Sequence, residues 1–295
     1  MNAKMLNADM FKQMSVPRAF RTLGALRTLA IGSVLLTGGL GAAHAEKLKL
    51  GNEGVYPPFS IVDSNGKLTG MEPELAREMC KRIGADCEIV TMDFKALIPS
   101  MLQGKFDGIV TQISPTPERQ EKALFATPIV YNPATFIVKK DSDYTLTKEG
   151  VTGKGLRIAL QRGASMVPYI HKHFGKDTFT EVYYDNPDQM KLDLLAGRLD
   201  LVFDSKINWS LELIAKPEGK DYKLAGGDHW LGDPAIPEAE RGYSWIFPKK
   251  SEELVKKVNT ALAEMIKDCT YTKIRKQYVP VQTLIAEGPC LDKVN

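Results

Sequence analysis

An arginine stands where a helix is least suited to hold one. The stretch GIVTQISPTPERQEKA contains Thr116 and Pro117, which predict a helix start with a hydroxyl cap and a proline at the first helical position. Arg119 then falls in the first turn, where the helix dipole favours acidic side chains. An arginine that opposes this dipole needs an anionic partner. The sequence allows an acid of the same chain, such as Glu121, or a ligand carboxylate that the planar guanidinium would bind.

Two other segments contain side chains that a simple turn does not require. In GNEGVYPPF, Glu53 follows a predicted strand, and Tyr56 precedes two prolines that stiffen its backbone. The tyrosine ring either packs in the core or offers a flat surface to an organic or cationic group. In LQRGAS, Gly163 allows a close backbone approach, and the amide of Ser165 begins a helix, which favours an anion.

These segments lie at the ends of predicted strands in an alternating pattern. KLKLGNE, CEIVTM and FDGIV have the period of strands, and residues 73–83 and 94–104 have the period of helices. The same alternation repeats over residues 156–214, and a last helix is predicted to run from Ser251. Residues 132–155 are expected to form a linker and a surface loop, and residues 225–242 another irregular segment. The order predicts an α/β fold with two mostly parallel sheets flanked by helices and ligands at the carboxyl ends of strands.

Residues 1–45 have the pattern of a secretory signal peptide. A basic stretch precedes the apolar run Leu29–Ala43, which is too short for a membrane span, and the run ends in a small-x-small motif. We expect cleavage after Ala45, with Met1 or Met14 as the true start. The leader has five basic residues and one acidic residue, so the net charge of +3 falls to about −1 without it. This balance favours neither nucleic acid nor an anionic membrane as a partner.

Four cysteines follow the predicted cleavage site. Cys80 and Cys87 are close together, as are Cys269 and Cys290, so an exported chain is expected to form two local disulfides. Buried free thiols are the alternative for the second pair. The spacings do not fit a CxxC zinc or redox motif, and the histidines are few, so we expect no metal and no cofactor.

Together these motifs resemble the family 3 periplasmic solute-binding proteins of ABC transporters, and especially the receptors for lysine, arginine, ornithine and histidine. The likeness runs over residues 47–280 and includes GNEGVYPPF, LAREMCKRIGADC, TPERQ, IALQRGAS and AEMIKDCTYTKIRKQY. It implies a type II periplasmic binding protein fold. Lobe 1 would comprise residues 46–132 and 243–295, lobe 2 residues 136–239, with two hinge strands between them.

The resemblance also implies a function and a set of site residues. The protein would be a periplasmic monomer that binds a cationic or polar amino acid, or a derivative such as an opine, and delivers it to an inner-membrane ABC permease. Arg119 matches the residue that holds the ligand α-carboxylate, Glu53 matches an acid that meets the distal cation, and Tyr56 and Phe94 match flanking rings. The other implied polar contacts are Thr111, Gln112, Ser114 and Ser165. The Cys80–Cys87 pair matches a disulfide of the same branch.

One position departs from the family pattern. The family has an aspartate that binds the α-ammonium five residues after the aspartate of GRLD, where this chain has Ser205, with Asp204 one residue earlier. Adjacent strand residues point to opposite faces. Either a one-residue bulge turns Asp204 toward the cleft, or the α-ammonium is held in another way. The segment Gly226–Gly242 also fits the family poorly, and its Asp228, His229 and Trp230 either reshape the pocket or belong to a surface loop.

An enzyme on the same fold is the alternative function. Secreted cyclohexadienyl dehydratases, which act on prephenate or arogenate, resemble these receptors and also use an arginine for a substrate carboxylate. Glu53 would then be a general acid or base. In the receptor interpretation no residue is catalytic.

Overall fold

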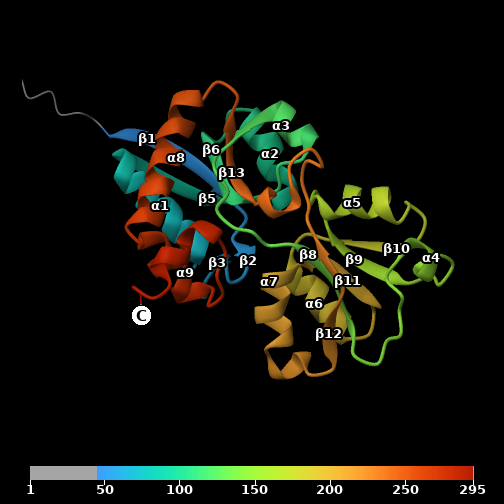
Figure 1. The fold of residues 1–295 in the computed structure, drawn as a ribbon. Helices are drawn as coiled ribbons and strands as arrows, with labels where there is room; N and C mark the ends of the chain where they lie inside the picture. Colours follow the sequence, from blue (N-terminus) through green and yellow to red (C-terminus); the bar gives the residue numbers. More distant parts are fainter. Residues whose placement is uncertain (1–44, 295) are drawn as a thin grey trace, which may run out of the picture. The chain divides into compact units, whose positions relative to one another are not determined.

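Helices and strands alternate along the described chain (Figure 1). The structure, a computed structural model, describes residues 45–294. The predicted signal peptide, residues 1–45, lies outside this range apart from Ala45. No helix among the described residues is long and apolar enough to cross a membrane. The predicted α/β fold class, with two mixed sheets flanked by helices, is confirmed.

The first sheet has the strand order β5-β1-β6-β13-β7. Its strands are β1 (Glu46–Asn52), β5 (Ala85–Thr91), β6 (Gly108–Ile113), β7 (Ala123–Phe125) and β13 (Ser244–Pro248). Strand β1 is parallel to β5 and β6, whereas β13 is antiparallel to β6 and β7. A small antiparallel sheet follows β1 in the chain. Its strands are β2 (Val55–Tyr56), β3 (Ser60–Val62) and β4 (Leu68–Thr69).

The second sheet has the order β10-β9-β11-β8-β12. Its strands are β8 (Ala134–Lys139), β9 (Arg157–Gln161), β10 (Thr180–Tyr184), β11 (Leu201–Ser205) and β12 (Tyr222–His229). Strand β9 is parallel to β10 and β11, and β8 is antiparallel to β11 and β12. In both sheets, therefore, parallel strands from neighbouring β-α-β units carry their carboxyl ends to one edge.

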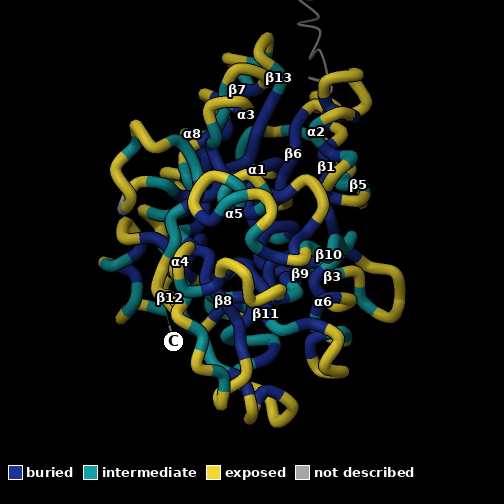
Figure 2. The backbone as a smooth tube through the Cα atoms, turned by 90° about the vertical axis from the view of Figure 1, so that its right-hand side faces the viewer, coloured by how far each residue is buried: buried dark blue, intermediate teal, exposed yellow. Residues whose placement is uncertain are grey.

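Helices cover the faces of both sheets, and the strands form the buried interior (Figure 2). The first sheet is covered by α1 (Met71–Ile83), α2 (Phe94–Leu102) and α8 (Glu252–Lys267), and α9 (Thr270–Tyr278) packs against α1. On the second pack α5 (Met166–His173) and α6 (Pro187–Leu195). The remaining short helices are α3 (Pro117–Lys122), α4 (Lys148–Val151) and α7 (Lys206–Trp209), which a π-helical turn extends to Ile214.

Helix α8 shows how the sequence pattern produces this packing. Val258 and Met265 belong to the predicted apolar stripe and are fully buried in the core of the first sheet. The helix starts at Glu252, directly after Ser251, although the serine side chain makes no capping hydrogen bond.

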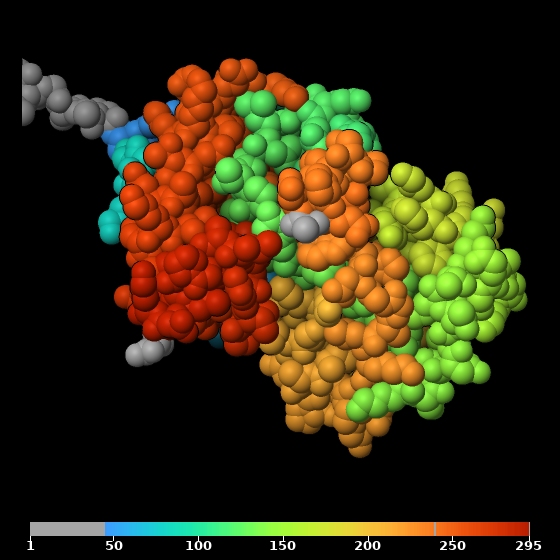
Figure 3. Space-filling view, in the orientation of Figure 1, coloured from blue at the N-terminus to red at the C-terminus, as the bar shows by residue number. Residues whose placement is uncertain are grey.

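The two stretches between the sheets differ from the prediction. Residues 132–155, expected as linker and loop, contain β8, whose first five residues are buried between β11 and β12. Residues 225–242 begin inside β12, and Leu231 is buried in the core. Figure 3 shows the stretch between β12 and β13, in orange, at the surface of this face of the molecule. The error arises because a central strand of six residues is hidden between turn-forming residues, where no periodicity of useful length can be read.

Both predicted disulfides are present. Cys80 of α1 is bonded to Cys87 of β5, and Cys269, just before α9, is bonded to Cys290 near the C-terminus. No free cysteine is found in residues 45–294. The second bond therefore ties the C-terminal segment to the helices that cover the first sheet.

Candidate functional site

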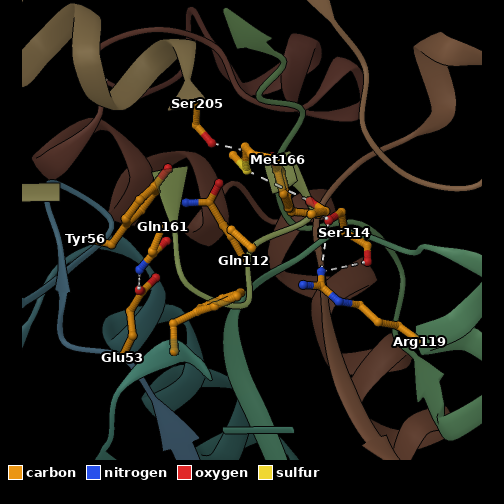
Figure 4. Close-up of a pocket in the computed structure, with 12 residues that line it drawn as sticks. Glu53, Tyr56, Gln112, Ser114, Arg119, Gln161, Met166 and Ser205 are labelled. Atoms are coloured by element: carbon orange, nitrogen blue, oxygen red, sulfur yellow. Dashed lines mark hydrogen bonds between the residues drawn. The ribbon is translucent and has the colours of Figure 1, made fainter. Parts of the chain in front are cut away.

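A polar pocket lies where strands of both sheets end (Figure 4). Glu53 follows β1, Ser114 follows β6, Gln161 ends β9 and Ser205 ends β11. The cavity volume of the pocket is about 20 Å³, so the side chains of the two sheets lie close together around it. Its lining consists of Glu53, Tyr56, Phe94, Gln112, Ser114, Arg119, Gln161, Ala164, Ser165, Met166, Ser205 and Tyr243.

Arg119 enters this pocket from the first turn of α3. Thr116 caps the helix by accepting a hydrogen bond from the Arg119 amide, and Pro117 is its first residue, both as predicted. The guanidinium is buried and donates to the carbonyl and hydroxyl oxygens of Ser114 at 3.2 and 3.0 Å, and to the carbonyl of Gly163 at 3.0 Å. Its central carbon lies 5.8 Å from the centre of the Phe94 ring.

The guanidinium of Arg119 has no acidic partner. Among residues 45–294, no carboxylate oxygen lies within 4.0 Å of its nitrogens, and the neighbouring Glu118 pairs with Lys122 at 2.6 Å instead. The bond to Glu121 that the sequence left open is therefore not formed. Burial lowers the pKa of Arg119 to about 10, so the group is still a cation at neutral pH. A buried, unpaired cation with free donor capacity is a site for an anionic group.

The turn that follows β9 in the second sheet lies in close contact with helix α2 of the first sheet. Gly163 has φ +78°, and a Cβ there would lie 3.0 Å from the Cα of Lys95 in α2, so only glycine fits without a shift. Ser165 immediately precedes α5, and the hydroxyl of Ser114 donates to its hydroxyl at 2.6 Å. The predicted close approach at Gly163 is confirmed, and it brings the start of α5 beside Arg119.

Glu53 lies on the opposite side of the pocket from Arg119 (Figure 4), and it forms a pair of buried carboxylates with Glu72. Thr111 bridges them, donating to Glu53 at 3.3 Å or to Glu72 at 3.2 Å. Gln161 donates to the other oxygen of Glu53 at 3.1 Å from the second sheet. Burial raises the pKa of Glu53 to about 7, and burial together with the charge of Glu53 raises the pKa of Glu72 well above its usual range.

Strand β11 places its last two residues on different sides. Ser205 lines the pocket, and its hydroxyl lies 3.5 Å from that of Tyr243. Asp204 accepts hydrogen bonds from the Tyr56 hydroxyl at 2.8 Å, the Trp209 indole at 2.9 Å and the Ser205 amide at 2.7 Å. The register with β8 runs through Asp204 and Ser205 without interruption, so the bulge that the sequence left open does not occur.

The structure brings most of the predicted residues together. Eight line the pocket, namely Glu53, Tyr56, Phe94, Gln112, Ser114, Arg119, Ser165 and Ser205. Thr111 and Asp204 lie directly behind them, bonded to Glu53 and Tyr56. Trp230, by contrast, does not line the pocket.

Several residues of the site were missed. Gln161 lies within the predicted LQRGAS segment and Met166 directly follows it. Tyr243 enters from the second crossing between the sheets, where no local pattern marks it. Glu72 could have been found, because it continues the apolar stripe of α1 through Leu75, where an acid is unusual.

Comparison with known proteins agrees with this architecture. Residues 48–281 match the family model of "Bacterial extracellular solute-binding proteins, family 3". The chain belongs to this family. The solute-binding protein is 32% identical over 240 residues to the "Histidine-binding periplasmic protein" of Escherichia coli (strain K12), a match that covers 80% of this chain and 89% of the relative. It is 32% identical over 241 residues to the "Lysine/arginine/ornithine-binding periplasmic protein" of the same strain, with the same coverage.

Solved structures agree with the two-lobe fold. The structure of "An ancestral arginine-binding protein bound to arginine" is similar with a TM-score of 0.69 and 30% identity, over 79% of this chain and 97% of that one. A second, "the ancestral amino acid-binding protein AncCDT-1, a precursor of cyclohexadienyl dehydratase", has a TM-score of 0.67 and 26% identity, over 79% and 95%. The predicted resemblance is thus confirmed, and these relatives are named as binding proteins and not as enzymes.

Proposed function

We propose that this solute-binding protein is a periplasmic receptor that binds an amino acid with a cationic side chain and delivers it to an inner-membrane ABC permease. One observation carries the proposal: the buried guanidinium of Arg119 faces a closed pocket and has no carboxylate partner among the described residues. A bound α-carboxylate would supply that partner through charge-assisted hydrogen bonds. The start of α5 at Ser165 would add backbone donors to the same group.

The opposite side of the pocket has complementary chemistry. Glu53 is buried, accepts two hydrogen bonds, and has no cationic partner within 4.0 Å among the described residues. A ligand ammonium or guanidinium beside it would compensate the ionised carboxylate. Tyr56 and Phe94 would flank the aliphatic part of the ligand. The Nε2 group of Gln112, which has no hydrogen-bond partner in residues 45–294, would donate to the ligand. The site thus favours a molecule with an anion at one end and a cation at the other.

The relatives support the same ligand class and cellular setting. Their names give histidine, lysine, arginine and ornithine as ligands and describe them as periplasmic proteins. The signal peptide predicted at residues 1–45 fits export. We propose a monomer with lobe 1 at residues 46–132 and 243–295 and lobe 2 at residues 136–239. The ligand would stabilise the arrangement in which both sheets close around it.

A ligand screen tests this proposal. L-arginine, L-lysine, L-ornithine and L-histidine, each at 100-fold excess over its Kd, should stabilise the folded protein by about 2.7 kcal/mol and raise the melting temperature by several degrees. L-glutamate should not, because its side-chain carboxylate would meet Glu53. Prephenate and arogenate turnover is assayed on the same sample. Turnover without stabilisation by any amino acid would overturn the receptor and favour the dehydratase.

A further inference from the structure

A chain of hydrogen bonds joins the small antiparallel sheet to the second sheet beside the pocket. The Tyr56 hydroxyl, on β2, donates to one oxygen of Asp204 at 2.8 Å, and Asp204 is the next-to-last residue of β11 in the second sheet. The other oxygen accepts from the indole of Trp209 at 2.9 Å. All three side chains are at most 4% exposed. The contact therefore lies in the interior and links residues 148 positions apart.

The Asp204 carboxylate accepts three hydrogen bonds from the protein. Besides Tyr56 and Trp209, the amide of Ser205 donates to it at 2.7 Å. Three donors to a buried carboxylate compensate much of its desolvation, and no cation lies within 4.0 Å among the described residues. These three donors occupy most of the roughly four acceptor positions of the carboxylate, so the protein itself satisfies Asp204 without a ligand.

Neutral groups occupy the position next to it that does face the pocket. Ser205 lines the pocket and is adjacent to the hydroxyl of Tyr243 at 3.5 Å. Burial raises the pKa of Tyr243 to about 12, so this hydroxyl is uncharged at neutral pH. The pocket near β11 thus offers hydroxyl oxygens and no carboxylate.

We propose that Asp204 is a positioning residue that latches Tyr56 to the second sheet, and that the amine end of the ligand meets the hydroxyls of Ser205 and Tyr243. The proposal rests on the proposed amino-acid receptor function and specifies one end of its site. Two consequences follow. Tyr56 is held over the ligand only while the sheets are together, so the latch slows ligand release. Because the amine meets neutral oxygens, a ligand without an α-ammonium still binds.

Two probes and a double-mutant cycle test this assignment. The probes are L-arginine and 5-guanidinopentanoate, which is arginine without its amine. The wild-type protein should bind the second within about tenfold of the first, whereas loss of a buried ion pair with a carboxylate would weaken binding at least about a hundredfold. Tyr56→Phe and Asp204→Ala should each raise the dissociation rate of both probes by a similar factor, about tenfold. In the double variant the effect should not exceed that of the stronger single variant.

A second tyrosine–carboxylate hydrogen bond, outside the pocket, serves as a matched control for the bond between Tyr56 and Asp204. Tyr184 donates to Asp193 at 2.6 Å, and both residues belong to the second sheet and its helix α6, outside the pocket. Tyr184→Phe should leave both dissociation rates unchanged. Asp204→Ala could instead weaken the binding of L-arginine but not of 5-guanidinopentanoate, both in the wild-type protein and in the Tyr56→Phe variant. Asp204 would then bind the amine, and the proposal would be wrong.

The ligand-free protein provides an independent test. Tyr56→Phe should lower the melting temperature of the wild-type protein but not of the Asp204→Ala variant, because alanine has no acceptor for the tyrosine hydroxyl and the bond is already lost there. An equal decrease in both backgrounds would overturn the latch. Failure of the wild-type protein to bind either probe would contradict the proposed function, while the melting cycle would still decide the role of Asp204.

Discussion

Binding of a cationic ligand should release a proton from Glu53. Burial raises the pKa of this carboxyl from its ordinary 4.5 to about 7, opposed by the hydrogen bond from Gln161. At pH 7 the group is therefore about half ionised in the ligand-free protein. A ligand cation beside it favours the ionised form and lowers the pKa again. Binding and proton release are then linked, and each depends on the other.

The expected magnitude follows from the ionised fraction. With a pKa of about 7, Glu53 is about nine-tenths ionised at pH 8 and about one-tenth ionised at pH 6. If only the ionised form binds the cation, affinity for L-arginine should be about tenfold weaker at pH 6 than at pH 8. At pH 7, binding should release about half a proton per protein molecule.

Titration calorimetry in two buffers measures this proton directly. Phosphate and Tris differ in ionisation enthalpy, so the difference between the two observed binding enthalpies gives the number of protons released. Neutral L-glutamine serves as the control ligand, and Glu53→Gln should abolish the release. Glu72→Gln should retain it, because burial and not Glu72 is the main cause of the raised pKa of Glu53. Equal enthalpies in both buffers, together with an affinity for L-arginine that does not change between pH 6 and pH 8, would refute the placement of Glu53 beside the cation.

Three further predictions concern the buried arginine, the buried acid and the second disulfide. Arg119→Ala should weaken the binding of L-arginine, measured by calorimetry, by about 3 kcal/mol or more. The control Arg162→Ala removes an exposed ion pair to Asp185 and should weaken this binding by less than about 1 kcal/mol. Similar losses in the two variants would contradict the role of Arg119. Glu53→Gln should stabilise the ligand-free protein at pH 8. The raised pKa means that the free energy of unfolding of the wild-type protein falls by roughly 3 kcal/mol as pH rises from below 4.5 to above 7. Urea unfolding at pH 5 and pH 8 measures this change, and an equal change in the wild-type protein and the variant would exclude the effect. Replacing both Cys269 and Cys290 by serine opens a loop with a separation of 21 residues and should lower the free energy of unfolding by about 3 kcal/mol; an unchanged denaturation midpoint would contradict this.

Local chemistry was enough to predict the first half of the site. Thr116 and Pro117 fix the start of α3, and the arginine that follows them is anomalous in that position whatever the fold. Glu53 and Ser165 could be placed because parallel strands bring their carboxyl ends to one edge. For such residues, element type and order determine position, and both can be read from periodicity.

The second half depends on contacts that no local pattern encodes. Tyr243 reaches the pocket only because the chain returns to the first sheet through β13, and Gln161 meets Glu53 only across the two sheets. Strand alternation did separate Asp204 from Ser205, but the partner of Asp204 is a tyrosine 148 residues away. The sequence therefore predicts which polar side chains each helix or strand carries, but not which of them form hydrogen bonds between the two sheets.

The buried charges explain why the same residues set both stability and selectivity. A guanidinium and a carboxylate held out of water without oppositely charged partners among the described residues destabilise the ligand-free fold. Burial therefore lowers the pKa of Arg119 and raises that of Glu53, which favours the neutral form of each. A ligand with an anion at one end and a cation at the other removes both penalties at once, whereas a ligand with one charge removes only one. Discrimination between ligands then arises mainly from the charge left uncompensated. A variant such as Glu53→Gln should therefore gain stability and lose selectivity together, because one desolvated carboxylate is the source of both.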